Sequence, residues 1–306
     1  MNAYETKNWD TVIQNIQNEL TCYIRNSNIK SLVLGVSGGI DSALCAALVY
    51  PVCKNLGIKL IGRSLTIETN KPEEIERAQK VGRAFCDDFQ EVDLGNMYRG
   101  MIAQLAIGEN ETINSTLTLE DKIRLGNVKA RTRMVYLYNL AQKYKGMVLS
   151  TDNLSERFLG FWTLAGDIGD FAMIQNLWKT EVYSLSIYMA SQYINGKAYD
   201  NKAEALNLCI NGVATDGLGI TVSDVAQLQA KNYSEVDMIL KTWLTDDSDK
   251  FTYDDYLRYA GRVENYEDFI KIREQYKNHP VVLRYERTHF KRDWPHNINR
   301  SNLFSN

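Results

Sequence analysis

Hydrophobic residues near the start of the chain recur at every third or fourth position: Trp9, Val12, Ile13, Ile16, Leu20 and Tyr23. This spacing places them on one face of a helix, so the segment is predicted to be an amphipathic helix. A short apolar run follows at 31–36, which is the length of a buried strand. Residues 43–49 are rich in helix formers. The chain therefore begins with a helix, a strand and a second helix.

The same alternation continues through the first half of the chain. Further apolar runs predict three more strands, at 59–65, 89–93 and 146–150. A helix is expected to begin near Pro72, and a long helical pattern runs from about Leu119 to Tyr144, interrupted at Gly126. Strands separated by helices need crossover connections, which build a mostly parallel sheet with helices on both faces. We therefore expect a doubly wound α/β fold in the first 160 residues.

The second half of the chain has a different pattern. Beyond Lys179 it is mainly helical, with polar loops near Asp200, Asp216 and 246–249, and it ends in a basic, aromatic tail over 284–300. No internal repeat or low-complexity linker separates the halves. We expect one domain over 1–306, with an α/β nucleotide-binding core at about 27–180 and a helical C-terminal extension at 181–306.

Composition excludes several classes of protein. Of 306 residues, 44% are hydrophobic and 24% are charged, as in ordinary globular proteins. The net charge of −3 provides no overall attraction to nucleic acid or to an anionic membrane, so neither is an expected partner. Five scattered cysteines form no C-x-x-C pair, and no run of about 18 apolar residues occurs. These features predict a cytoplasmic protein with reduced thiols.

The segment Ser37-Gly-Gly-Ile-Asp-Ser42 joins the first predicted strand to its helix. Gly38 and Gly39 allow the backbone to approach a ligand closely, and the helix N-terminus directs free N–H groups at an anion. Ser37 and Ser42 add hydroxyl groups. Asp41, an acid in an anion site, makes most sense as a ligand of a Mg²⁺ ion shared with phosphates. A plain glycine turn is the alternative, but the complete string in this context favours a phosphate site.

This string resembles the pyrophosphate loop (PP-loop) of the ATP pyrophosphatases. Later segments are similar, in order and spacing, to motifs of the NAD synthetases: 126–134, 150–156, 160–163, 169–172, 177–182 and 287–292. The resemblance covers most of the chain, from about Ser31 to Arg292. It implies an adenine nucleotide alpha hydrolase-like fold, ATP as co-substrate and Mg²⁺ as cofactor.

The resemblance also implies a reaction. ATP adenylylates the nicotinate carboxylate of deamido-NAD, pyrophosphate leaves, and ammonia displaces AMP to give the amide of NAD. Glutamine-dependent relatives carry an N-terminal amidase domain, but only 36 residues precede Ser37 here, fewer than the roughly 50 of a small domain. Free ammonia is therefore the expected nitrogen source, no glutaminase domain is expected, and the family implies a homodimer.

The resemblance assigns roles to individual positions. Its catalytic residues are Ser37, Asp41, Asp170 and Lys179. Its ATP-binding residues are Gly35, Val36, Ser37, Gly38, Gly39, Ile40, Asp41, Ser42, Thr151 and Lys179. Its Mg²⁺ ligands are Asp41 and Glu156, and its deamido-NAD-binding residues are Arg131, Asp170, His289 and Lys291. Outside the loop, each also has an ordinary interpretation as a helix cap, a turn residue or a solvated charge.

Two departures from the family pattern bear on the substrate. The family usually has a lysine where this chain has Leu164, and the segment is one residue shorter before Gly169. Met173 replaces a proline, and the usual Pro-Ser/Thr loop is not recognisable around 207–219. Two alternatives therefore stay open: adenylylation of another acceptor, as in tRNA thiolation, and a nucleotide-binding relative without turnover. The scattered cysteines and the net charge oppose the first, and Asp41, Glu156 and Lys179 oppose the second.

Overall fold

The computed structural model describes residues 8–68, 70–105, 118–195, 198–213, 223–245 and 266–292. Its centre is a parallel sheet in the order β3-β2-β1-β4. The strands are β1 (Ser31–Gly35), β2 (Lys59–Thr66), β3 (Asp88–Asp93) and β4 (Gly146–Val148). The register pairs Val33 of β1 with Ile61 of β2 and Val148 of β4. The predicted α/β class and parallel sheet are confirmed.

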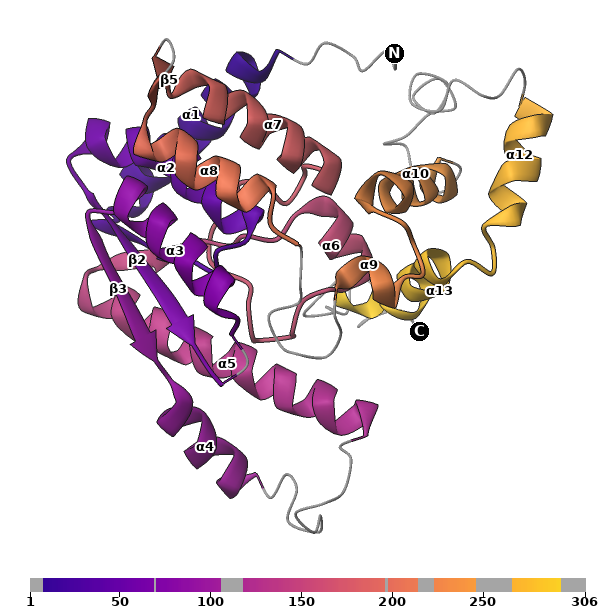
Figure 1. Cartoon of the computed structure of the whole chain (residues 1–306), viewed down its shortest axis with the longest axis horizontal. Coiled ribbons are helices and arrows are strands. Elements are labelled where there is room, and N and C mark those ends of the chain that lie inside the picture. Colours follow the sequence, from indigo (N-terminus) through magenta and orange to yellow (C-terminus); the bar gives the residue numbers. More distant parts are fainter. Residues whose placement is uncertain are drawn as a thin grey trace, which may run out of the picture.

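Helices cover both faces of this sheet (Figure 1). Successive side chains of a strand point to opposite sides, and in β1 the side chains on both sides are apolar and buried. Leu32 and Leu34 of β1 pack on one side with α1 (Trp9–Ser27), α2 (Ile40–Leu56), α3 (Pro72–Phe85), α7 (Lys179–Gln192) and α8 (Asn201–Ile210). Val33 packs on the other side with α4 (Gly95–Gln104) and α5 (Leu119–Lys143). The sheet therefore lies between two apolar layers.

Two details of this half differ from the sequence prediction. Helix α5 runs unbroken through Gly126, which is buried in it, so the predicted interruption is wrong. A glycine inside a helix costs only about 1 kcal/mol relative to alanine, and the buried face of α5 outweighs that cost. Helix α4 was not predicted, since its only buried residues are Gly95 and Tyr98. The polar stretch at 108–115 lies outside the described residues.

The rest of the chain is mainly helical, as predicted. It contains α6 (Leu154–Leu159), α9 (Asp224–Gln227), α10 (Tyr233–Leu244), α12 (Tyr266–Gln275), α13 (Pro280–Arg287) and the 3₁₀ turn η1 (His289–Lys291). A third apolar cluster joins α6, α10 and α13. A short hairpin, β5 (Ile194–Asn195) with β6 (Ala198–Tyr199), was not predicted. The expected loops near Asp216 and 246–249, and the tail beyond Arg292, lie outside the described residues.

None of the helices in the described part of the chain has both the length and the apolar character needed to cross a membrane.

Candidate active site

A cavity of about 720 Å³ lies at the carboxyl ends of the parallel strands, where open α/β sheets bind their ligands. The segment after β1, the end of β2 and one face of α3 form one side of it. Helix α5, the start of α7 and residues of α6 and α13 form the other side. Most of the chain's sequence motifs thus meet at one place.

The glycine loop between β1 and α2 forms one edge of this cavity. Gly38 has φ +80°, a conformation that only glycine adopts freely. Ser37 Oγ accepts a hydrogen bond from the Gly39 N–H (3.2 Å) and lies 3.1 Å from Ser42 Oγ, which donates to the Gly39 carbonyl (3.0 Å). The two serines therefore brace the turn, and the first residues of α2, Ile40 and Asp41, line the cavity.

Gly38→Ala is expected to destabilise the protein and to abolish ATP binding. A Cβ atom there would overlap the backbone carbonyl oxygen of Glu74 in α3, so either the loop or the helix must move. Gly57→Ala is the matched control, because Gly57 also has positive φ (+65°) but has open space around a Cβ atom, and it should cost only about 1–2 kcal/mol. Thermal unfolding and calorimetric titration with ATP measure both effects. Equal behaviour of the two variants would contradict the prediction.

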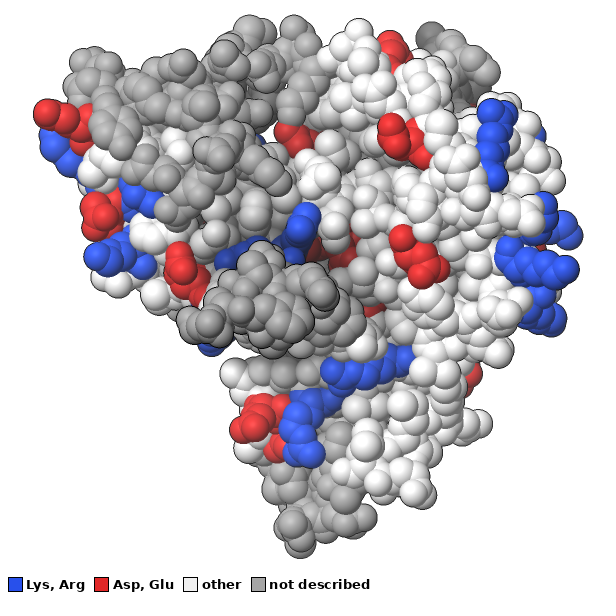
Figure 2. All heavy atoms as spheres, turned by 180° about the vertical axis from the view of Figure 1, so that it is seen from behind, with Lys and Arg blue, Asp and Glu red and all other residues white. Residues whose placement is uncertain are grey.

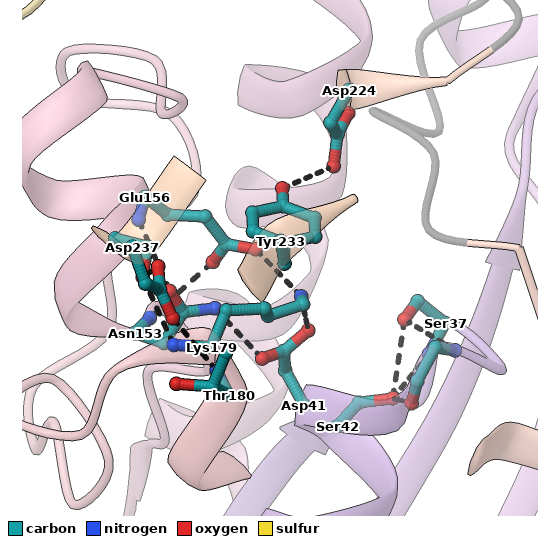
Figure 3. A network of polar contacts seen from close by, with 12 residues as sticks. Ser37, Asp41, Ser42, Asn153, Glu156, Lys179, Thr180, Asp224, Tyr233 and Asp237 are labelled. Carbon is teal, nitrogen blue, oxygen red and sulfur yellow. Dashed lines mark hydrogen bonds and ion pairs between the residues drawn. The ribbon is translucent and has the colours of Figure 1, made fainter. Parts of the chain in front are cut away.

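The side chains of Asp41, Glu156 and Lys179 meet directly after the glycine loop, in the first turn of α2, although they come from three different helices (Figure 3). Lys179 Nζ lies 2.5 Å from Asp41 Oδ2 and 2.9 Å from Glu156 Oε1. The Lys179 side chain is 2% exposed, and the two carboxylates are 16% and 15% exposed. One ammonium group therefore bridges two largely buried carboxylates.

Local capping holds these side chains in place. Asn153 is the N-cap of α6: its Oδ1 accepts from the Glu156 N–H (3.0 Å), and Glu156 Oε2 accepts in return from the Asn153 N–H (3.3 Å). The Asn153 amide also donates from Nδ2 to Asp41 Oδ1 (2.9 Å). Asn153, which the sequence analysis did not single out, thus connects α6 to the first turn of α2.

The charged groups of this cluster shift one another's pKa values. Burial opposes the charge of Lys179, but Asp41 and Glu156 outweigh it and hold the Lys179 pKa well above its usual range. Burial, and then the charge of Asp41, raise the pKa of Glu156 to about 8 although Lys179 opposes the rise. When Glu156 is ionised, the two carboxylates carry one negative charge more than the Lys179 ammonium neutralises. A further cation would favour this ionised state of the cluster.

Asp41 and Glu156 fit the expected Mg²⁺ ion. Mg²⁺ is usually held by one or two carboxylates together with water and substrate phosphates, and here two carboxylates converge on a resident cation, the Lys179 ammonium. Within the described part of the chain, no group of three or more His, Cys, Asp or Glu side chains could hold a metal by itself. Further ligands must come from the nucleotide or from water.

A second acidic pair lines the cavity beside this cluster. Burial and the nearby Asp167 raise the pKa of Asp152 to about 7, against the hydrogen bond that Ser150 Oγ donates to it (2.7 Å). Burial raises the pKa of Asp167 to about 6 in spite of the Thr163 N–H (2.7 Å) and the positive charges of Lys291 and Arg133. The cavity is therefore acidic on this side and attracts cations.

Asp152→Asn is expected to stabilise the protein at pH 8 by about 1–3 kcal/mol. The folded pKa of about 7 lies above the value of 3.8 for an unfolded aspartate, so the folded state binds the extra proton between these values and loses stability as pH rises through 7. The gain should shrink toward pH 5, where Asp152 is protonated. Unfolding midpoints at both pH values measure it, and a stability loss at pH 8 would contradict it.

Comparisons with known proteins agree with this geometry. The profile of the NAD synthase family matches residues 12–295. The chain belongs to the NAD synthase family. It is 34% identical over 187 residues to an NH₃-dependent NAD⁺ synthetase of Methanocaldococcus jannaschii, covering 59% of this chain and 68% of that one. It is 33% identical over 223 residues to one of Mycoplasmopsis pulmonis, covering 71% and 74%.

Solved structures share the fold of this family member. An NMN synthetase from Francisella tularensis superposes with a TM-score of 0.68 at 22% identity, covering 95% of this chain and 98% of that one. An NH₃-dependent NAD synthetase from Campylobacter jejuni superposes with a TM-score of 0.63 at 22% identity, covering 95% and 100%. At this identity the likeness describes the architecture, and the substrate is a separate question.

The structure brings most of the predicted ATP-binding residues of this NAD synthase family member together. The predicted residues that line the cavity are Gly35, Val36, Ser37, Gly38, Gly39, Ile40, Asp41, Thr151, Glu156 and Lys179. Ser42 does not line it, but it is buried beneath the loop and bonded to Ser37. The roles of these residues stay predictions, and their placement supports them.

None of the four residues predicted to bind deamido-NAD lines the cavity. Arg131 is exposed and donates from Nη2 to the carbonyl of Leu164 (3.1 Å). Asp170 accepts from Tyr138 Oη (2.9 Å) and the Val148 N–H (2.8 Å), at the edge of β4. His289 is exposed, and its Nδ1 lies 3.0 Å from the carbonyl oxygen of Glu286.

Lys291 is close to the cavity wall without lining it. Its Nζ donates to the carbonyl of Gly160 (2.8 Å) and to that of Trp162. Burial lowers its pKa to about 8, and Arg284 adds to this effect. In this structure Lys291 therefore supports the segment after α6. Residues 293–300 of the basic, aromatic tail lie outside the described residues.

Several cavity residues were not predicted. Among them are the following arginines and acids of the wall: Arg63, Arg77, Arg133, Arg284, Arg287, Glu74, Asp152, Asp167 and Asp224. Arg77 Nε donates to the Gly38 carbonyl (2.8 Å), and Arg133 Nε donates to the Leu65 carbonyl (3.2 Å). A signal existed for Arg133, Asp152 and Arg287, since they lie inside the motifs 126–134, 150–156 and 287–292. On the face shown in Figure 2, basic and acidic side chains are interspersed.

Proposed function

We propose that this chain catalyses the ATP-dependent amidation of deamido-NAD with ammonia to give NAD, AMP and pyrophosphate. The observation that carries the proposal is a cavity that joins the glycine loop and the Asp41, Glu156 and Lys179 cluster to a wall with arginines and aromatic residues. The NH₃-dependent relatives support the nitrogen source. Membership of the family supports the reaction class.

The chemistry proceeds in two displacements. An oxygen of the nicotinate carboxylate attacks the α-phosphorus of ATP, and the bond to the β-phosphate oxygen breaks to release pyrophosphate. The ammonia lone pair then attacks the activated carbonyl carbon, the bond to the AMP oxygen breaks, and a proton leaves the nitrogen. Negative charge therefore develops first on the leaving pyrophosphate.

Residues of this chain can stabilise that charge. The N-terminus of α2 would present its free N–H groups to the phosphates, and Lys179, a buried point charge beside the loop, would stabilise the departing pyrophosphate. Asp41 and Glu156 would hold Mg²⁺, which neutralises phosphate charge when it is bound. A cradle prepared in advance lowers the barrier because it need not reorganise during the reaction.

The opposite wall suits an anionic dinucleotide. Arg133 is half-buried in the cavity wall, and desolvation lowers its pKa, although Asp167 and Glu74 oppose the effect. Arg284 lies over the Phe161 ring at 3.8 Å from its centroid, and both residues line the cavity. Planar guanidinium groups bind phosphates in pairs of hydrogen bonds, and aromatic rings stack on bases. We propose this wall as the acceptor site.

The decisive experiment supplies the purified chain with ATP, Mg²⁺, ammonium and deamido-NAD. NAD and AMP should form in equal amounts, glutamine should be a poor donor, and the rate with ammonium should rise with pH, because only neutral ammonia has a free lone pair. A parallel reaction replaces deamido-NAD with nicotinate mononucleotide. Preferential amidation of the mononucleotide would overturn the proposed acceptor, and AMP formation without either amide would overturn the reaction.

A further inference from the structure

Helix α10 carries a buried acid that contacts α6 and α7 without lining the cavity. Asp237 is 1% exposed. Its Oδ1 accepts from Ser155 Oγ at 2.5 Å, and its Oδ2 accepts from the Thr180 N–H at 2.9 Å. Ser155 belongs to α6 and Thr180 to α7, so one carboxylate joins three helices. Figure 3 shows Asp237 beside Thr180 and Glu156.

These contacts adjoin two residues of the cation cluster. Ser155 precedes Glu156, and Thr180 follows Lys179. Ser155 Oγ also accepts from the Lys179 N–H at 2.9 Å, so its single proton is committed to Asp237. The first N–H groups of a helix have no partner within it, and here protein oxygens satisfy those of Lys179 and Thr180. The start of α7 is thereby fixed by Asp237 and Ser155.

The same helix also borders the Lys179 ammonium. Tyr233 lies one turn before Asp237 on α10, and Lys179 Nζ is 5.2 Å from the centroid of the Tyr233 ring. Asp237 of α10 thus binds the backbone next to Lys179, and Tyr233 of the same helix lies beside the Lys179 side chain. The contacts span 57 and 82 positions of sequence, so they join the helical extension to the nucleotide-binding core.

We propose that Asp237 is a positioning residue that sets Glu156 and Lys179 relative to the glycine loop. The proposal rests on the proposed function only in that these two residues act on bound ATP. A carboxylate is required because both of its oxygens accept at once from two different donors. An asparagine offers one oxygen and one NH₂ group, and the NH₂ group would face either the Ser155 hydroxyl or the Thr180 N–H.

The test compares Asp237→Asn with Thr242→Val. Thr242 is also fully buried on α10, and its hydroxyl donates to the Met238 carbonyl of the same helix. Asp237→Asn should lower kcat for AMP formation by about 10–100-fold with little change in KM for the acceptor, since small misplacements of catalytic groups cost up to about 10²-fold. Thr242→Val should keep kcat within about twofold, and thermal unfolding should show both variants folded.

A cycle with Ser155→Ala tests the route through the hydroxyl. Because Asp237 and Ser155 share a hydrogen bond, the double variant should lose less kcat than the product of the two single losses, whereas independent effects would multiply. Calorimetric titration with ATP and Mg²⁺ should show affinity weakened several-fold in Asp237→Asn, and this readout requires no amidation. Wild-type kcat and ATP affinity in a folded Asp237→Asn would overturn the proposal, as would multiplicative losses. Absence of NAD from the wild type, with the ATP affinities differing as stated, would overturn only the proposed function.

Discussion

Asp41→Asn is expected to reduce ATP-dependent pyrophosphate release by at least about 10²–10³-fold, the size of effect seen when one preorganised electrostatic group is removed. The amide keeps an oxygen to accept from Asn153 Nδ2, so the fold should survive. It removes the charge that faces Lys179 Nζ and one of the two carboxylates that would hold Mg²⁺. A pyrophosphate-release assay and circular dichroism measure activity and fold, and Asp41→Ala should behave alike.

The matched control is Asp87→Asn. Asp87 also pairs with a lysine at 2.5 Å, Lys54, and it accepts from the Leu60 N–H, but it lies at the amino-terminal edge of the sheet. Its replacement should leave pyrophosphate release near the wild-type rate. Near-wild-type release by Asp41→Asn at saturating Mg²⁺ would remove Asp41 from the site. Equal losses in the two variants would indicate a general effect of lost ion pairs.

The core of the fold and the nucleotide side of the site were predictable because their signals are local. Buried parallel strands read as short apolar runs, and the loop from Ser37 to Ser42 carries its turn, its hydroxyls and its acid within six residues. The structure brings Glu156 and Lys179 to that loop from sequence motifs that were themselves contiguous. Functional residues that lie within one short sequence motif can be recognised from the sequence alone.

The acceptor side was less predictable because the direction of a side chain depends on tertiary structure. Arg131 and Arg133 lie two residues apart on α5, so they point to nearly opposite sides, and only packing decides that Arg133 borders the cavity. Packing also decides that Asp167 lines the cavity and Asp170 does not, since both lie in a segment without regular secondary structure. Asp237 had no local signal at all, since its partners lie far away in sequence.

The Lys179 ammonium has a double role in this structure, because it is the counter-ion of the carboxylates that the nucleotide site needs. Lys179→Met is therefore expected to cost about 3–5 kcal/mol of stability at pH 8, as does removing one partner of a buried ion pair. The loss should shrink toward pH 5, where Glu156, whose pKa is raised to about 8 even with Lys179 present, is protonated. Pyrophosphate release should fall by about 10²-fold or more.

The same variant separates an electrostatic role from a merely structural one. With the ammonium gone, Asp41 and Glu156 form an uncompensated pair, so Mg²⁺ without nucleotide should raise the unfolding midpoint of Lys179→Met more than that of the wild type. Lys54→Met, which removes the half-exposed partner of Asp87, should show little loss of stability and no such gain. If Mg²⁺ instead stabilises the wild type and Lys179→Met equally, then Lys179 does not compete for the cation site, and its charge acts on the phosphates alone.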